Sequence, residues 1–172
     1  MSEDEFYEIM RPFLGPDGVD AAKLGIDKPK VDLAGSMALI EVLKGDWPKD
    51  VLHRAAWLLP RKQRNADICG ALCGLLRAPS EQSIPKFGPV TELFLINSAM
   101  ESATKANCDD LIGVMLDRSV SGQRMLFLGT VYKFDAARAI ETAQEVASWM
   151  GSYEAKAVDQ FLKRRRISLT QN

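Results

Sequence analysis

The chain has 172 residues, 47% of them apolar, and a formal net charge of −1 at pH 7. This length suits one domain with a substantial core, and the apolar share is too high for an intrinsically disordered chain. The near-neutral charge argues against a dedicated nucleic-acid-binding protein, and the apolar runs are far shorter than the roughly 20 residues that span a bilayer.

The first residues and the cysteines favour a cytoplasmic protein. Residues 1–5, Met-Ser-Glu-Asp-Glu, are acidic, whereas a secretory signal is basic and then apolar. The three cysteines, an odd number, stand among apolar residues, which suits a reducing compartment better than a disulfide scaffold. We therefore expect cytoplasmic localisation.

The helical pattern begins at residues 3–14, which predict a short helix ended by Gly15 and Pro16. Residues 15–31 contain three glycines and two prolines, so we expect a loop or a partly ordered cap there. Residues 1–31 are therefore predicted to form an N-terminal helix and loop that cap the domain that follows.

Three amphipathic helices are predicted over residues 32–44, 48–59 and 65–77, because each range carries an apolar stripe at the spacing of one helix face. Gly45 is expected to end the first, since glycine is common directly after the last helical residue. Asp46 is expected to cap the second.

Residues 78–89 predict a long loop. They hold three prolines within eleven residues, which excludes a regular helix. We expect this loop to join two helical hairpins and to interrupt an otherwise compact arrangement.

The second half of the chain predicts a different kind of helix. Segments 90–104, 109–117 and 123–134 are apolar around most of their circumference, as is usual for helices covered on two sides. Residues 136–150 return to a single apolar stripe, with Asp135 placed to cap that helix. Such a change from amphipathic to apolar and back is expected of stacked hairpins, whose central members are flanked on both sides.

Four helix-start segments recur with steps of 37, 33 and 32 residues, a period typical of stacked helical hairpins. The positions that align them are Arg54, Thr91, Arg124 and Lys156. We therefore predict an all-α fold, either a short α-solenoid or an irregular bundle of about four helical hairpins. This helical repeat domain would cover residues 32–166, followed by a C-terminal tail at 167–172.

The segments His53–Leu59 and Glu154–Leu162 share a basic residue followed by small and large apolar residues, and resemble the second helix of HEAT-type repeats. The turn Asp117–Arg124 is similar to the inter-helix turn of that family. The resemblance covers about residues 32–166 and departs from the family at Thr91, which is not basic. It implies a scaffold, adaptor or inhibitor that binds another protein, and it specifies no ligand.

A second resemblance involves Trp47–Leu52, Leu58–Lys62 and Cys69, which are similar to a bacterial family of unknown activity encoded near type VI secretion components. It covers about 25 residues. The family's usual tryptophan pair is replaced here by Asn65–Asp67. The resemblance implies a bacterial accessory protein.

No motif in the sequence specifies a reaction, so we predict that the protein is not an enzyme. His53 is the only histidine, which removes any catalytic arrangement that needs two. Gly35-Ser36-Met37-Ala38 lacks the closing glycine of a nucleophile elbow, and no glycine-rich phosphate loop ends in Gly-Lys-Ser/Thr.

Cys69 and Cys73 lie one helical turn apart and would be able to face one metal ion. The remaining candidate ligands, His53 and Cys108, are distant in sequence. Both cysteines also fall on or beside the apolar stripe of their helix, where free cysteine behaves as a small hydrophobe. We expect them to pack in the core and predict no metal and no cofactor.

The candidate binding surface is basic. Residues 51–77 hold five Arg or Lys against Asp67 alone, and four of these cations occupy one helix and the turn after it. The basic face is expected to contact an acidic surface of another protein, or alternatively the phosphates of a nucleic acid, and no membrane. The three tryptophans are read either as exposed interface anchors or as partly buried core. The residues expected to make contact are Arg54, Trp57, Arg61, Lys62, Arg64, Lys86 and Phe87.

Overall fold

The protein is described by a computed structural model that covers residues 2–25, 27–60, 62–77, 86–149 and 152–166. Within these ranges all regular secondary structure is helical, which confirms the predicted all-α fold. The α-helices are α1 Glu3–Leu24, α2 Leu33–Lys44, α3 Lys49–Leu58, α4 Ala66–Arg77, α5 Pro89–Ser102, α6 Cys108–Leu116, α7 Phe127–Phe134, α8 Ala136–Ala147 and α9 Tyr153–Arg165. Short 3₁₀ helices, η1 Lys105–Asn107 and η2 Gly122–Leu126, precede α6 and α7. No helix of the described ranges is both long and apolar enough to cross a bilayer.

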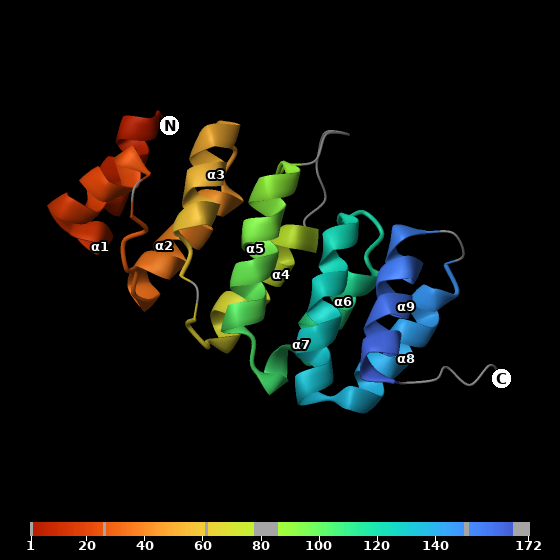
Figure 1. Ribbon diagram of the computed structural model, residues 1–172. Coiled ribbons are helices and arrows are strands. Elements are labelled where there is room, and N and C mark those ends of the chain that lie inside the picture. The colour runs from red at the N-terminus through yellow and green to blue at the C-terminus, as the bar shows by residue number, and fades with distance from the viewer. Residues whose placement is uncertain (1, 26, 61, 78–85, 150–151, 167–172) are drawn as a thin grey trace.

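The helices form two layers in a row of successive pairs (Figure 1). In one layer α2, α4, α6 and α8 contact one another in that order. In the other, α3 contacts α5, α5 contacts η2 and α7, and η2 contacts α9. Helix α1 packs on α2 and α3 and closes the left-hand end of the row, while α8 and α9 form the right-hand end.

The four positions that align the sequence repeat lie in α3, α5, η2 and α9. All four elements belong to the second layer, each as the second member of a helical pair. The period in the sequence is therefore the spacing of one layer of this structure. Thr91 and Arg124 are buried at these positions and Lys156 is exposed, so the four positions share a place in the layer and not a degree of burial.

Residues 15–31 were expected to form a loop or a partly ordered cap, but α1 occupies the first part of this range. Helix α1 continues to Leu24, with one interruption at Gly15, whose φ of 70° and ψ of 169° are accessible to glycine because it has no Cβ. Val19 and Ala22 are buried, so the second half of the helix packs on the core. The many glycines and prolines of this segment favour a loop, but burial of the Val19 and Ala22 side chains stabilises a helix instead.

The structure confirms two of the predicted helix-end residues and shows that a third prediction is wrong. Gly45 ends α2, and the Asp135 carboxylate accepts a hydrogen bond from the Arg138 amide at the start of α8. Asp46 does not cap α3, which begins after Pro48 without a side-chain cap. The loop predicted over 78–89 falls mostly outside the described residues, since the structure resumes at residue 86.

A buried arginine in η2 contacts both α6 and the last helix, α9. The Arg124 side chain is 1% exposed and donates from Nε to the Met115 carbonyl at 2.9 Å and from Nη1 to the Val120 carbonyl at 2.7 Å. The same Nη1 lies 2.9 Å from the Glu154 carboxylate, and the Trp149 ring stands 5.8 Å away. A hydrogen bond from its own backbone and the Arg124 guanidinium hold the pKa of Glu154 below its usual range. The Glu154 carboxylate therefore remains ionised at neutral pH.

Candidate functional site

An open groove of about 810 Å³ lies between two chain segments that connect helices at the α1 end of the row. One wall is the α1–α2 linker, and the other is the end of α3 with the α3–α4 linker. We call this feature the basic groove. It is lined by Lys28, Pro29, Lys30 and Val31 on the first wall and by Trp57, Pro60, Lys62 and Gln63 on the second.

Local chemistry explains why the first wall is an open linker against α2. Pro29 has no backbone N–H and disfavours a helical conformation at the residue before it. A Cβ at Gly35 in α2 would lie 2.7 Å from Cγ1 of Val31 and 3.0 Å from Cβ of Phe13. Because glycine leaves that space empty, the α1–α2 linker lies directly on the first turn of α2.

The second wall is held in an unusual backbone conformation. Lys62 has a φ of 132°, a value that non-glycine residues rarely adopt and that costs on the order of 1–3 kcal/mol. Two side chains contact this part of the chain: the Lys28 ammonium donates to the Leu59 carbonyl, and Ser36 Oγ of α2 lies 3.0 Å from Gln63 Oε1. The Lys28 contact joins the two walls, and the Ser36 contact joins α2 to the second wall.

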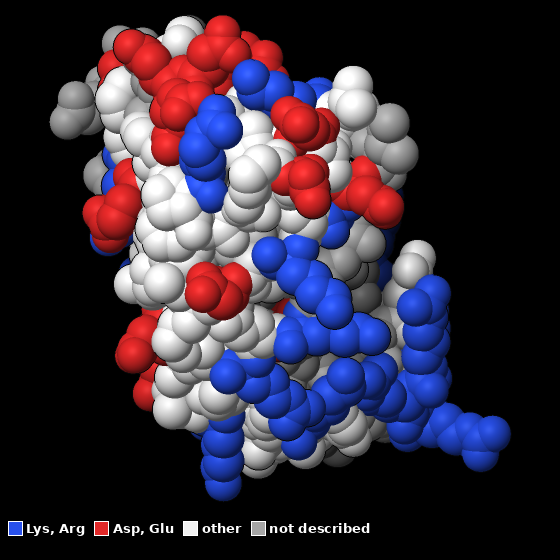
Figure 2. Space-filling model, turned by 90° about the vertical axis from the view of Figure 1, so that its left-hand side faces the viewer, with Lys and Arg blue, Asp and Glu red and all other residues white. Residues whose placement is uncertain are grey.

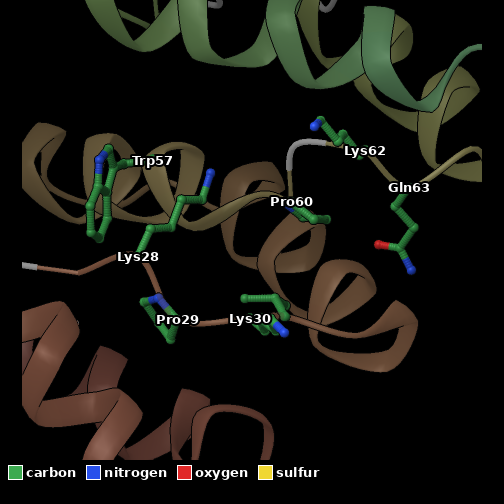
Figure 3. A pocket seen from close by; sticks show the side chains of 8 residues that line it. Lys28, Pro29, Lys30, Trp57, Pro60, Lys62 and Gln63 are labelled. Atoms are coloured by element: carbon green, nitrogen blue, oxygen red, sulfur yellow. The ribbon is translucent and has the colours of Figure 1, made fainter.

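The groove is positively charged. Three of its described lining residues are lysines, and none is Asp or Glu. Lys30 and Lys62 are exposed, and within the described ranges neither ammonium makes a hydrogen bond or an ion pair. Figure 3 shows Trp57 near one end of the groove, Gln63 near the other and Pro60 between them.

Arg54 borders the groove without lining it. Its guanidinium lies 5.6 Å from the Trp57 ring and 3.9 Å from the Glu3 carboxylate of α1. The Trp57 ring is half-buried and packs on the core. Arg54 therefore holds the indole in place and adds positive charge beside it.

The α1 end of the row carries both signs of charge. Figure 2 shows Asp and Glu gathered along the upper edge of this end, and Lys and Arg over its lower right part. The first turn of α1 contributes Glu3, Asp4 and Glu5, which complement the positive end of that helix. The basic groove therefore has an acidic neighbour on the same face.

The structure brings together part of the basic surface predicted from the sequence. Trp57 and Lys62 line the groove, Arg54 borders it, and Arg64 is exposed nearby in sequence but is not among the described lining residues. Arg61 lies outside the described residues. The sequence analysis did not identify the first wall. Its Lys-Pro-Lys sequence at 28–30 combines positive charge with a helix breaker, which indicates an exposed basic loop.

Lys86 and Phe87 are not among the described residues that line the groove. Phe87 is 8% exposed and packs in the core. The Lys86 ammonium donates to the carbonyl of Lys44, at the C-terminal end of α2. The basic groove is at the other end of that 12-residue helix, about 18 Å away at 1.5 Å per residue.

The burial of the tryptophans agrees with their interpretation as partly buried core residues. Trp47, Trp57 and Trp149 are all half-buried and pack against the core. Of these three residues, Trp57 also lines the basic groove.

His53 and the cysteines have packing roles. His53 Nδ1 lies 3.0 Å from Thr91 Oγ1, and its ring stands 5.4 Å from that of Phe94, so it fills the contact between α3 and α5. All three cysteines are free and buried. The described residues contain no group of three or more His, Cys, Asp or Glu side chains placed to hold a metal ion.

The cysteine thiols are expected to be inert in the native protein. The hydrogen bond between the Cys69 and Cys73 thiols, together with burial, raises the pKa of Cys73, and burial raises that of Cys108. We expect a disulfide reagent at pH 8 to modify the native protein at least about a hundredfold more slowly than the urea-unfolded protein, because thiolate forms on opening. Modification of one thiol at the unfolded rate would contradict this packing.

Comparison of the chain with protein-family models, with curated proteins and with solved structures finds no match.

Proposed function

We propose that the protein is a non-catalytic interaction module, an adaptor, scaffold or inhibitor, that binds an acidic protein partner through the basic groove. The observation that supports this proposal is a groove with three lysines and no acidic residue among its described lining side chains. Unpaired ammonium groups on opposite walls favour carboxylates that bridge them, and such charge complementarity gives specificity and a fast association rate.

An acidic protein segment fits this surface better than a nucleic acid does. Binding of single strands relies on aromatic faces on which bases stack, whereas the Trp57 ring packs on the core and has the Arg54 guanidinium beside it. Glu3 and Asp4 stand at the same end of the molecule and would repel a long polyanion. A short acidic segment avoids that repulsion.

The resemblance to HEAT-type repeats supports the same class of function, since such repeats serve mainly as binding surfaces. The two-layered row of helical pairs is compatible with it. The alternative is a type VI secretion-associated accessory protein of a bacterium, which would supply the context of the interaction. In either case we propose a cytoplasmic location.

Charge reversal on both walls tests the proposal. We expect the double variant Lys30→Glu/Lys62→Glu to capture at least about tenfold less of an acidic partner from an extract of the source organism, as two attractive pairs become repulsive. Capture is measured by quantitative mass spectrometry at low and physiological salt. Both lysines are exposed, so the free energy of unfolding should change by less than about 0.5 kcal/mol.

The matched control is Lys105→Glu/Lys133→Glu, which makes the same change of charge on η1 and α7. It should capture the partner as the wild type does. Equal losses in the two double variants, or binding of DNA or RNA by the wild type in preference to protein, would reject the groove as a protein-binding site.

A further inference from the structure

We infer that the basic groove takes an extended segment of its partner with alternating acidic and apolar residues, which pairs through its backbone with the α1–α2 linker. The inference rests on the proposed function and specifies the form of the ligand. It follows from the linker backbone, from the positions of the cations and from the apolar parts of the opposite wall.

The linker offers an open peptide edge. Residues 28–32 belong to no helix or strand, and Asp32 is extended, with φ −80° and ψ −173°. Pro29 favours an extended conformation at Lys28 as well. In Figure 3 this linker runs along one side of the groove, beneath Trp57 and Pro60.

The backbone of this edge lacks partners. Within the described part of the chain, the N–H and C=O groups of Lys30 and Val31 make no hydrogen bond. In an extended chain successive residues turn these groups to opposite edges, so the N–H and C=O of Lys30 point to one side of the linker and those of Val31 to the other. An added peptide strand satisfies such a pair, which is how extended segments bind to exposed edges.

The side chains around the edge define the sequence that fits. Cations stand on both walls, with Lys30 on the linker and Lys62 opposite. The second wall also presents two apolar surfaces, that of Pro60 between these lysines and that of Trp57 near one end of the groove. Carboxylates of a bound segment suit Lys30 and Lys62, and apolar side chains suit Trp57 and Pro60. An extended segment brings both kinds of side chain to the groove, because it turns alternate residues to opposite sides. The ligand is therefore a short alternating segment and not a continuous run of acidic residues.

A nucleic acid does not supply this combination, because its backbone has no peptide N–H groups to match the linker. A folded acidic surface does not supply it either, since its backbone groups are already paired. A nucleic acid and a folded acidic surface are therefore the two ligands whose binding would argue against the inference.

The test uses fluorescence anisotropy with the full chain and four probes of ten units. The first is a labelled peptide of alternating Glu and Leu, and the second is the same peptide with every Leu nitrogen methylated, which keeps the charge but removes half of the N–H groups. The third alternates Lys and Leu, and the fourth is single-stranded oligothymidylate. Each probe is titrated against the wild type, Lys30→Glu and the control Lys133→Glu, with helix content checked by circular dichroism.

We expect the Glu-Leu peptide to bind the wild type and the Lys-Leu peptide not to bind. Methylation should weaken binding by about tenfold or more, the consequence of losing backbone hydrogen bonds at a partly buried edge. Lys30→Glu should weaken it by a similar factor, and Lys133→Glu should leave it within about twofold.

The remaining outcomes separate this inference from the function on which it rests. Equal binding of the methylated and unmethylated peptides, with both lost in Lys30→Glu, overturns backbone pairing but leaves the groove as a site for acidic protein. Absence of binding by either acidic peptide, or tighter binding of the oligothymidylate, overturns both the inference and the proposed function.

Discussion

Replacing Arg124 with methionine is expected to lower the free energy of unfolding by about 3–5 kcal/mol. The guanidinium is buried and is the hydrogen-bond donor to two backbone carbonyls and the ion-pair partner of Glu154. Methionine fills a comparable volume, so the loss comes from polar groups left without partners in a water-poor site. Urea unfolding followed by circular dichroism measures it, provided that the urea dependence of the free energy is unchanged.

Arg118→Met is the matched control for this prediction. The Arg118 guanidinium lies 4.8 Å from the same Trp149 ring, but the residue is exposed. Its replacement should cost less than about 1 kcal/mol. A loss in Arg124→Met no larger than in this control would show that the buried network does not stabilise the fold.

Replacing Phe6 with alanine is expected to destabilise the whole protein by about 3–5 kcal/mol. Phe6 is fully buried in the first turns of α1, with its ring 5.2 Å from that of Tyr7. Because α1 packs on both α2 and α3, we expect a single unfolding transition at lower urea. The thermal midpoint should also fall, which calorimetry measures.

Ile9→Ala serves as the comparison, since Ile9 lies on the same helix and is 44% exposed. It should cost less than about 1 kcal/mol. A separate early transition in Phe6→Ala, with the main transition unchanged, would instead make α1 a unit that unfolds on its own.

The parts of the fold that could be predicted from the sequence depend on short-range rules. The Asp135 cap and the Gly45 helix end follow from residues within one turn, and both are confirmed. The spacing of the helical pairs can be recognised in the sequence because each pair packs against its neighbours in a similar way. The wrong expectations, such as the loop over residues 15–31, concern places where distant packing decides.

Only residues of the second wall of the groove could be predicted from the sequence, for a similar reason. Trp57 and Lys62 share one helix and its following turn, so their proximity is local. Lys28 and Lys30 meet them only because α2 carries the chain away and α3 brings it back. The space at Gly35 that lets the linker lie so close becomes visible only once α2 and the linker are packed together.

The basic groove is formed by two interhelical connections that are separate in sequence, the α1–α2 linker and the α3–α4 linker. The Lys28 ammonium already ties one connection to the Leu59 carbonyl of the other. A ligand that contacts both walls links the α1–α2 connection to the α3–α4 connection and stabilises the folded state by mass action. Its signature would be slower amide hydrogen exchange in α1, α2 and α3, with α8 and α9 exchanging at their former rates.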